Sequence, residues 1–571
     1  MRVLTFLLLS IYSCTQLWAQ PQKEYPKDYF RSPLDVPLVL AGTFGELRTN
    51  HFHSGIDIKT QQREGLKVYA VAEGVVSRIK VGVYGFGKAL YVRHPNGYTT
   101  VYAHLSRFSD EIEAYIRQEQ YRKKSYEVEI FPPASAFPFK KGDVIAYSGN
   151  SGGSGGPHLH FEVRDTRTEN IINPLLFGFD VKDNRAPQVF GVYAYDFDEE
   201  DELLGSEHYR VINTANGRYA LAGDGIVEVQ QRPGFGVVTI DRLDGATNKN
   251  GPYSIKCFVG DQIYYHFEME TFAFHETRYI NSHIDFGQKV CCGTRVNKMF
   301  LDPGNNLSTY RATPRMNLPA LVKDSIYNAR IEIADLGGNT TVVDFKVKSK
   351  GSLLENPAEP GNLPVFKYNQ SNSFKNEQVQ IELSSGSLYR DILFEYRTEP
   401  SFAGLYSPVH YLAAEEIGVQ RYYTLKIKPE NFEGIPSSKL AIASIKNNKI
   451  VDYEGSGYAN GFVSCRTRQF GGFAVVADTN SPLVSFVNFR DGDVVRKSEL
   501  QIRISDDFSG IDSYNVYVDG QWVRAEYDYK ADMLRVQKSD LDFEAGAHQF
   551  KVVVADALNN RTERKVELIW P

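Results

Sequence analysis

The sequence predicts a mainly β protein built from several domains. Its 571 residues exceed the length of one ordinary domain, and phenylalanine and tyrosine are abundant at 35 each. Apolar and polar residues alternate over many short stretches, as in half-buried strands, whereas long helical periodicity is scarce. We therefore expect an antiparallel β domain over residues 20–182, β-sandwich domains over 183–350 and 478–571, and a β-rich domain over 351–477 between them.

The N-terminus has the features of a secretion signal. Arg2 supplies a positive charge, an apolar run covers residues 3–9, and a cleavage point follows Ala19, so residues 1–19 are predicted to be removed on export. A lipid anchor on Cys14 is the less favoured alternative, because a bulky tyrosine precedes it. We expect the mature protein in the periplasm, the cell envelope or the medium, with no membrane-spanning segment.

Two short motifs offer metal ligands. The first begins with His53 and ends with Asp57, and the second contains His158 and His160. Side chains two apart on a strand share a face, so one of the latter two histidines can bind a metal while the other stays free beside it. The Ser-Gly pair inside the first motif disfavours a helix, which leaves its two ends across a turn or a short strand. Two imidazoles and one carboxylate form the ligand set of a catalytic zinc site with one open position.

The distribution of histidine strengthens this prediction. Either motif alone would be a weak signal, but six of the 12 histidines lie between His51 and His160, and His104 adds another imidazole to the set. The helical His-Glu-x-x-His motif of other zinc proteases is absent. All four cysteines after the signal lie beyond residue 182, which excludes thiolate ligands in this region.

Residues from about 38 to 177 resemble the lysostaphin-type, LytM-like zinc endopeptidases that cut peptidoglycan cross-links. The resemblance covers about a quarter of the chain. The matching segments, in chain order, are Gly42–Gly45, His53–Asp57, Val71–Val76, Asn96–Leu105, Lys141–Ile145, Ser148–Gly152 and the motif at His158.

This resemblance implies an antiparallel β-sheet peptidase domain that holds one Zn²⁺ through His53, Asp57 and His160. It also implies that His104 and His158 stay unligated beside the metal-bound water. One of these two would act as general base, and the other would stabilise the oxyanion or give a proton to the leaving amine.

The segment 149–157 is rich in glycine and serine. We interpret it as one wall of a substrate groove, because glycines let an extended peptide approach the backbone closely. Asn150, Ser151 and Gly152 are its candidate substrate-binding residues. The alternative is a flexible connector that leads into the strand at His158.

Residues 106–140 form an insertion relative to the compact family pattern. Its first half, from Asp110 to Lys124, is predicted to be helical, since acidic residues lie at its start and basic residues at its end. The insertion could line the groove, act as a lid or be peripheral, and the sequence leaves these alternatives open.

The remainder of the chain contains an internal repeat, which predicts two related β-sandwich units. The second unit resembles bacterial immunoglobulin-like domains, and the first is about seventy residues longer, so it should contain an insertion. Their proposed roles are support and spacing, or docking to the wall or to a partner protein. The paired signatures are Asp183-x-x-x-Pro187 with Asp478-x-x-x-Pro482, and Asp335 to Asn339 with Asp556 to Asn560.

The exported chain would permit disulfides among Cys257, Cys291, Cys292 and Cys465. A bond between adjacent cysteines would be strained, so we expect Cys257 to pair with one member of the adjacent couple. The alternative is that these cysteines are small buried apolar residues.

These observations predict an exported zinc-dependent endopeptidase that hydrolyses peptide cross-links of peptidoglycan. The net charge of −6 gives no reason to expect a nucleic-acid partner. Two alternatives remain. One is a non-catalytic activator or scaffold for other wall hydrolases, and the other is a zinc protease that acts on glycine-rich proteins.

Overall fold

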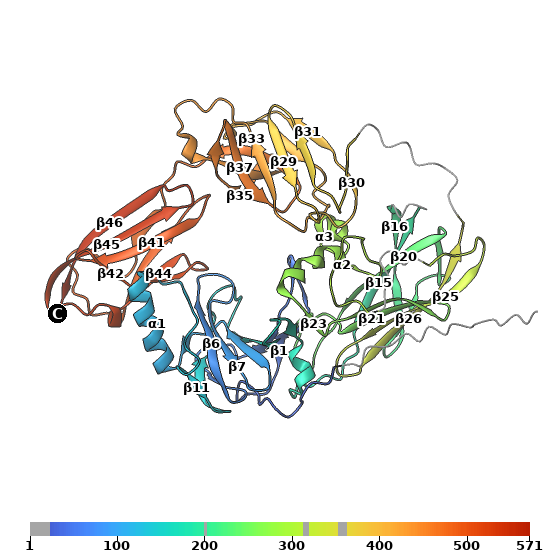
Figure 1. The fold of residues 1–571 in the computed structure, drawn as a ribbon, viewed down its shortest axis with the longest axis horizontal. Helices are drawn as coiled ribbons and strands as arrows, with labels where there is room; N and C mark the ends of the chain where they lie inside the picture. The colour runs from blue at the N-terminus through green and yellow to red at the C-terminus, as the bar shows by residue number, and fades with distance from the viewer. Residues whose placement is uncertain (1–22, 199–202, 312–318, 352–362) are drawn as a thin grey trace, which may run out of the picture.

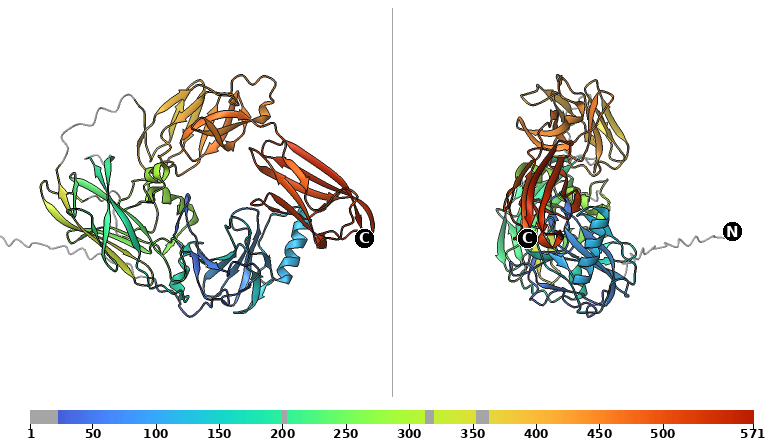
Figure 2. Two further views of the ribbon diagram at one scale, coloured as in Figure 1. Left: turned by 180° about the vertical axis from the view of Figure 1, so that it is seen from behind. Right: turned by 90° about the vertical axis from the view of Figure 1, so that its left-hand side faces the viewer.

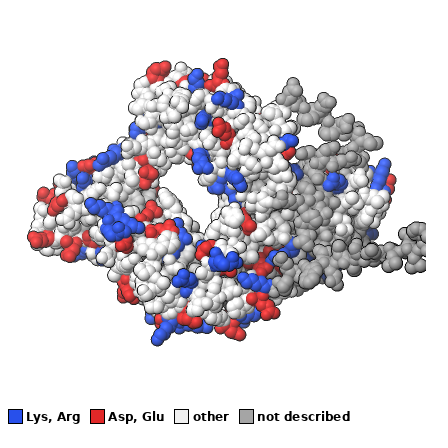
Figure 3. Space-filling view, viewed as in Figure 1, with Lys and Arg blue, Asp and Glu red and all other residues white. Residues whose placement is uncertain are grey.

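The computed structural model describes residues 23–198, 203–311, 319–351 and 363–571. The predicted signal at 1–19, which includes Cys14, and residues 352–362 lie outside these ranges. The described chain is mainly β, as predicted. Four β units follow one another around a ring (Figure 1), and Figure 2 shows the same closed arrangement from behind. Side chains do not fill the middle of the ring in Figure 3.

The N-terminal unit is built on an antiparallel sheet whose middle strands bring the predicted site residues together. The strand β13 lies between β4 and β8, so His160 pairs with Asp57 on one side and with Ala103 on the other. The sheet order is β1 (Leu40–Gly42), β4 (Ile56–Lys59), β13 (His158–Asp165), β8 (Tyr98–Ala103), β7 (Lys88–Arg93), β6 (Gly74–Val81) and β10 (Val128–Ile130), with β11 (Pro138–Phe139) beside β6 and β14 (Ile171–Ile172) beside β13.

Smaller elements surround this sheet. The segment that carries His53 follows a two-stranded hairpin, and a three-stranded sheet packs nearby. These elements are β2 (Leu47–Arg48) with β3 (His51–Phe52), the sheet β5 (Lys67–Tyr69), β12 (Val144–Tyr147) and β9 (Arg107–Phe108), and the 3₁₀ helix η1 (Pro174–Phe177).

The predicted helix of the insertion is α1 (Asp110–Lys123). Ile112, Ile116 and Gln120 are its buried residues, and Lys124 ends the helix in the left-handed conformation. The exposed side of α1 meets the C-terminal unit (Figures 1 and 2).

This contact gives the insertion a position that none of the three alternatives from the sequence described. Arg117 forms an ion pair with Asp540, and the Tyr121 hydroxyl donates to the same residue. The Tyr121 ring packs edge-on against Trp522. The helix is therefore a docking face for the C-terminal unit.

The second unit spans residues 188–349 and is a sandwich, because buried residues of its two sheets share one hydrophobic core. It also carries the helices η2 (Phe274–Tyr279), α2 (Ile280–His283) and α3 (Phe286–Cys292), and β23 (Thr271–Phe272), which pairs with β14. One sheet has the order β16 (Leu203–Tyr209), β15 (Gln188–Phe197), β20 (Arg232–Ile240) and β24 (Asn297–Lys298). The other has the order β17 (Val211–Ala215), β18 (Arg218–Leu221), β26 (Thr340–Ser349), β25 (Ile326–Ala334), β21 (Ser254–Val259) and β22 (Gln262–Glu268), with β19 (Ile226–Val229) beside β26.

The third unit spans residues 365–477 and consists of two five-stranded antiparallel sheets around their own core. The first sheet has the order β28 (Asn372–Lys375), β29 (Val379–Leu383), β33 (Tyr423–Ile427), β37 (Phe462–Thr467) and β36 (Tyr458–Ala459). The second has the order β31 (Tyr396–Glu399), β32 (Val409–Leu412), β38 (Gly471–Ala477), β34 (Leu440–Lys446) and β35 (Lys449–Gly455). The short elements are β27 (Val365–Phe366), β30 (Ile392–Leu393) and η3 (Ser437–Lys439).

The C-terminal unit spans residues 483–570 and has two four-stranded sheets. Its strand order β42-β41-β45-β46 corresponds to the order β22-β21-β25-β26 of the second unit. The sheets are β39 (Leu483–Phe486), β40 (Glu499–Ser505), β44 (Met533–Gln537) and β43 (Glu526–Asp528), and β42 (Gln521–Val523), β41 (Ile511–Val518), β45 (Gly546–Asp556) and β46 (Arg561–Trp570), with η4 (Lys538–Asp540) between β44 and β45.

The expectation for the cysteines was wrong. Cys291 and Cys292 form a disulfide with each other at the end of α3. Cys257 is buried in the sandwich core on β21 and Cys465 is buried on β37, and both are free thiols. Cys257 is therefore an apolar core residue, which is the alternative that the sequence left open.

No helix among the described residues has the length and apolar character needed to span a membrane.

Candidate metal centre

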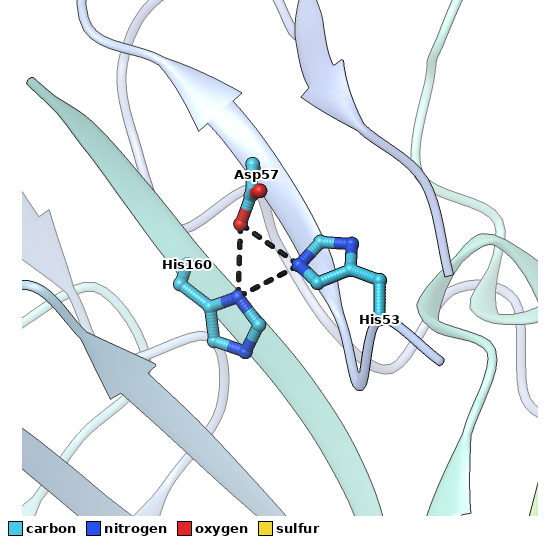
Figure 4. Close-up of side chains that lie close together, drawn as sticks. All are labelled: His53, Asp57 and His160. Atoms are coloured by element: carbon cyan, nitrogen blue, oxygen red, sulfur yellow. Dashed lines mark hydrogen bonds and ion pairs between the residues drawn. The ribbon is translucent and has the colours of Figure 1, made fainter. Parts of the chain in front are cut away.

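His53, Asp57 and His160 converge in the N-terminal unit (Figure 4). His53 Nε2 lies 3.0 Å from Asp57 Oδ1 and 3.1 Å from His160 Nδ1. The third side of the triangle, from His160 Nδ1 to Asp57 Oδ1, measures 2.8 Å. All three side chains are buried. Two imidazole nitrogens and one carboxylate oxygen thus face a single point that one small cation could occupy.

The outer nitrogens of both histidines have partners that fix which nitrogen faces the cluster. His53 Nδ1 lies 2.8 Å from the carbonyl oxygen of Thr43, and His160 Nε2 lies 3.0 Å from Glu162 Oε1. When these outer nitrogens donate, His53 Nε2 and His160 Nδ1 each present a lone pair to the centre. Metal-binding histidines are usually oriented by such carboxylate and carbonyl partners.

The charges around the cluster favour an ionised carboxylate. Burial opposes the charge on Asp57, but the neighbouring imidazoles of His53, His158 and His160 hold its pKa well below the usual range. Burial likewise opposes the charge on Glu162, yet the Arg164 guanidinium and His160 lower its pKa to about 2. Both carboxylates are therefore anionic at neutral pH.

Two charged partners of this cluster were not identified from the sequence. Arg48 lies 2.5 Å from Asp57 Oδ2 and pairs with Glu46, so it holds the carboxylate oxygen that faces away from the histidines. Glu162, the partner of His160, was recognisable in principle, because it lies two residues further along β13 and hence on the same face. The position of Arg48 depends on the turn between β2 and β3, for which the sequence carries no comparable signal.

His104 and His158 flank the cluster, and their ring centroids lie 4.8 Å apart. His104 Nδ1 contacts the carbonyl oxygen of Ser151 at 2.9 Å, and His158 Nδ1 contacts that of Gly156 at 2.8 Å. With these nitrogens donating, each Nε2 is left as a proton acceptor. His158 Nε2 lies 3.4 Å from Asp57 Oδ1.

Burial, reinforced by the neighbouring imidazoles His160 and His158, lowers the pKa of His104 to about 3. The His104 ring is therefore neutral at physiological pH. The His104 residue directly follows β8, and its backbone is in the left-handed conformation, with a φ of 58°. This sharp turn lets the residue leave the sheet and face β13 across the site.

The three candidate substrate-binding residues have different roles in the structure. Ser151 is occupied with the protein itself: its hydroxyl donates to the Leu105 carbonyl at 2.8 Å, and its own carbonyl accepts from His104. Gly152 has a φ of 69°, and a Cβ there would lie 2.3 Å from the Gly87 nitrogen, so glycine is required. Asn150 keeps a buried Oδ1 without a hydrogen-bond partner among the described residues. Of the three, only Asn150 has a buried side-chain atom that no described residue pairs with.

The C-terminal unit reaches this same loop. Lys530 Nζ donates to the carbonyl oxygen of Asn150 at 2.5 Å and to that of Ser154 at 3.2 Å. Nearby, Glu526 forms an ion pair with Lys88 at 3.1 Å. The wall of the site is therefore held partly by residues almost 400 positions further along the chain, a relationship that sequence motifs cannot reveal.

The fold and the site define a β-sheet domain with a His-Asp-His cluster and two flanking histidines. Residues 51–121 match the model of peptidase family M23, so the N-terminal unit is a domain of this peptidase family, as the sequence motifs predicted. Residues 364–478, which contain the third unit, match the model of the Zu5-like domain.

Two curated relatives are similar to about a quarter or less of the chain. The DD-carboxypeptidase/endopeptidase Mpg of Neisseria meningitidis serogroup B is 37% identical over 118 residues, which cover 21% of this chain and 21% of that protein. The cell division protein DipM of Caulobacter vibrioides is 27% identical over 138 residues, covering 24% and 18%. The match thus spans about a fifth of the length of each relative.

A similar solved structure is the catalytic domain of the antimicrobial peptidase lysostaphin from Staphylococcus simulans. It is 21% identical and covers 24% of this chain and 91% of its own, with a TM-score of 0.19.

Proposed function

We propose that this protein is an exported, zinc-dependent endopeptidase that hydrolyses peptide cross-links of bacterial peptidoglycan. One observation carries the proposal. His53, Asp57 and His160 present three donor atoms to one point, and His104 and His158 flank that point with free acceptor nitrogens. A non-catalytic scaffold has no need for this complete set.

The donor set fits zinc. Its atoms are His53 Nε2, Asp57 Oδ1 and His160 Nδ1, and two nitrogens with one carboxylate oxygen are typical of catalytic zinc sites. A zinc ion held there would supply Lewis acidity, which activates water and polarises the carbonyl of the bond to be cut. The partners Thr43 and Glu162 would keep the two imidazoles oriented.

The flanking histidines would manage the proton. His158 Nε2 lies 3.4 Å from Asp57 Oδ1, so we assign it to take the proton from the attacking water and pass it to the leaving amine. His104, kept neutral by burial, would accept the second hydrogen bond of that water and so orient it. The Ser151 carbonyl would hold His104 in place for this task.

Peptidoglycan is the substrate that the relatives favour. One is named a DD-carboxypeptidase/endopeptidase and the other a cell division protein. The predicted secretion signal would bring this protein to the same compartment as the wall. The glycine-containing loop at 149–157 would contact the extended peptide.

The test is digestion of purified peptidoglycan followed by mass analysis of the fragments. The enzyme should be the zinc-loaded mature chain, with His160→Ala as the inactive variant and His51→Ala as the matched control, because His51 is an exposed histidine outside the cluster. The proposal predicts loss of cross-linked dimers with the wild type and with His51→Ala only. Dimers that persist with all three proteins would contradict it.

A further inference from the structure

Two groups of three aspartates occupy the second and the C-terminal units. Within each group, one carboxylate oxygen from every member lies within 4.8 Å of the others. Neither group contains a histidine or a cysteine, so they differ chemically from the cluster at His53. The groups are Asp183, Asp241 and Asp335, and Asp478, Asp506 and Asp556.

The two groups stand at equivalent places in the two units. Asp183 and Asp478 each lie five residues before the first strand of their unit, β15 and β39. Asp241 directly follows β20, and Asp506 directly follows β40. The third members, Asp335 and Asp556, lie at the ends of the corresponding strands β25 and β45.

Hydrogen bonds repeat this equivalence at the level of single atoms. The Asn339 side chain donates to Asp335 Oδ2 at 2.8 Å and to the Asp183 carbonyl at 3.2 Å. In the C-terminal unit the Asn560 side chain donates to Asp556 Oδ2 at 2.7 Å and to the Asp478 carbonyl at 3.1 Å. An asparagine at the equivalent position therefore joins the first and third aspartates in each unit.

Within the described part of the chain, none of the six carboxylates forms an ion pair with lysine or arginine at up to 4.0 Å. In the C-terminal group, Asp478 is only 3% exposed, yet its Oδ2 accepts no hydrogen bond from a described residue. Asp506 Oδ1 is also buried and has no hydrogen-bond partner in the described ranges. Leaving buried charged oxygens unpaired is costly, and a bound cation would compensate them.

We propose that each group binds one Ca²⁺ ion. Carboxylate and carbonyl oxygens are the ligands of hard cations, and Ca²⁺ accepts the irregular geometry of three aspartates from separate loops more readily than Mg²⁺ does. An exported protein meets calcium at concentrations that suit sites with dissociation constants of about 10⁻⁴ to 10⁻³ M.

The position of the sites indicates what calcium would do. Asp478 comes directly after β38, the last strand of the third unit, and Asp183 lies in the link between η1 and β15. The first group also borders a cavity of about 140 Å³ that Phe44 and Leu175 of the N-terminal unit help to line. Each ion would thus tie a linker to the sandwich that follows it and fix the angle between neighbouring units.

Calcium titration of the full-length mature protein, followed by isothermal calorimetry, tests this proposal. The protein is freed of calcium and then reloaded with one equivalent of zinc. The wild type should bind two Ca²⁺ per chain, and Asp506→Asn and Asp241→Asn should each bind one. The double variant should bind none, and circular dichroism should show that its strands are intact.

Calcium should also raise the melting temperature of the wild type but not that of the double variant, because only a protein that binds the ion in its folded state is stabilised. The absence of binding up to about 10 mM, well above the usual extracellular range, would overturn the proposal. Binding that the substitutions leave unchanged would overturn it as well. Both readouts are independent of peptidase activity, so they stand apart from the proposed function.

Discussion

His160 and Asp57 are direct cross-strand partners on β13 and β4, and His160 Nδ1 lies 2.8 Å from Asp57 Oδ1. A sheet register therefore sets the distance between two of the three predicted ligands. Both strands are largely buried, so the pair is held in place before any cation binds, as a precise metal site requires.

His160→Ala should lose zinc and peptidase activity together. The substitution removes one of three donor atoms, and two donors hold zinc far more weakly. Elemental analysis of the purified variant measures the metal content. His51→Ala, which removes an exposed histidine from the same unit, should retain one zinc per chain; if His160→Ala also retained it, the ligand assignment would be wrong.

His158→Ala should keep its zinc but lose most of its turnover. Its Nε2 is an acceptor beside the cluster and is not one of the three converging atoms. Loss of a general base typically lowers the rate by about 10² to 10⁴-fold. Steady-state hydrolysis of a cross-linked peptide, measured on protein of known zinc content, gives this number. Turnover within a factor of two of the wild type would remove His158 from the proposed mechanism.

Glu162→Gln should weaken zinc binding while the three ligands remain. Glu162 orients His160 through a 3.0 Å contact, and such outer partners are worth about 10 to 100-fold in metal affinity. Competition with a chromogenic chelator measures the change. Glu169→Gln is the matched control, because Glu169 also pairs with Arg164 but is exposed and does not contact His160. Equal affinities in the two variants would contradict the role given to Glu162.

Lys530→Ala should lower kcat without lowering zinc content. Lys530 is a positioning residue that holds the carbonyls of Asn150 and Ser154, and the next carbonyl of that loop, from Ser151, orients His104. Small displacements of a catalytic group can cost on the order of 10²-fold in rate. Lys530→Arg should restore part of the activity. Lys565→Ala, a change on the exposed surface of the same unit, should have no effect; equal effects from Lys530→Ala and Lys565→Ala would rule out the positioning role.

The aspartates of the second unit predict an unusual pH dependence of stability. Burial and the carboxylates of Asp183 and Asp335 raise the pKa of Asp241 to about 7, although Arg185 opposes the shift, and burial raises that of Asp183 to about 6. Both pKa values exceed the ordinary 3.8, so the folded state binds these protons more tightly than the unfolded state.

Their contribution to stability is therefore complete at low pH and is lost as the pH rises through about 6 to 7. In calcium-free buffer, the melting temperature of the wild type should fall between pH 5 and pH 8 by more than that of Asp241→Asn. Parallel curves for the two proteins would show that Asp241 does not titrate in this range.

The convergence of His53, Asp57 and His160 was predictable from the sequence because these residues lie in two short motifs. Strand periodicity placed His158 and His160 on one face, and the structure agrees. The residues that contact the cluster were harder to predict from the sequence. Arg48 reaches Asp57 because of the β2–β3 hairpin, and Thr43 contributes only its backbone carbonyl. Every residue has a backbone carbonyl, so the residue type does not show which carbonyl acts as a partner.

The closure of the ring was not predictable. The helix α1 was foreseen within one residue, but its partner Asp540 lies more than 400 positions away, and no local pattern encodes that contact. The sequence repeat showed that Asp183 corresponds to Asp478. That Asp183 lies near Asp241, and Asp478 near Asp506, could be seen only from the strand order of each sandwich.

The most direct test of the central claim is to titrate zinc back into the chelated wild-type protein while measuring hydrolysis of cross-linked peptidoglycan fragments on the same samples. The account predicts that activity rises in proportion to bound zinc and reaches its plateau at one zinc per chain in the site of His53, Asp57 and His160. Full hydrolysis by zinc-free protein, or its absence at full occupancy, would contradict the account.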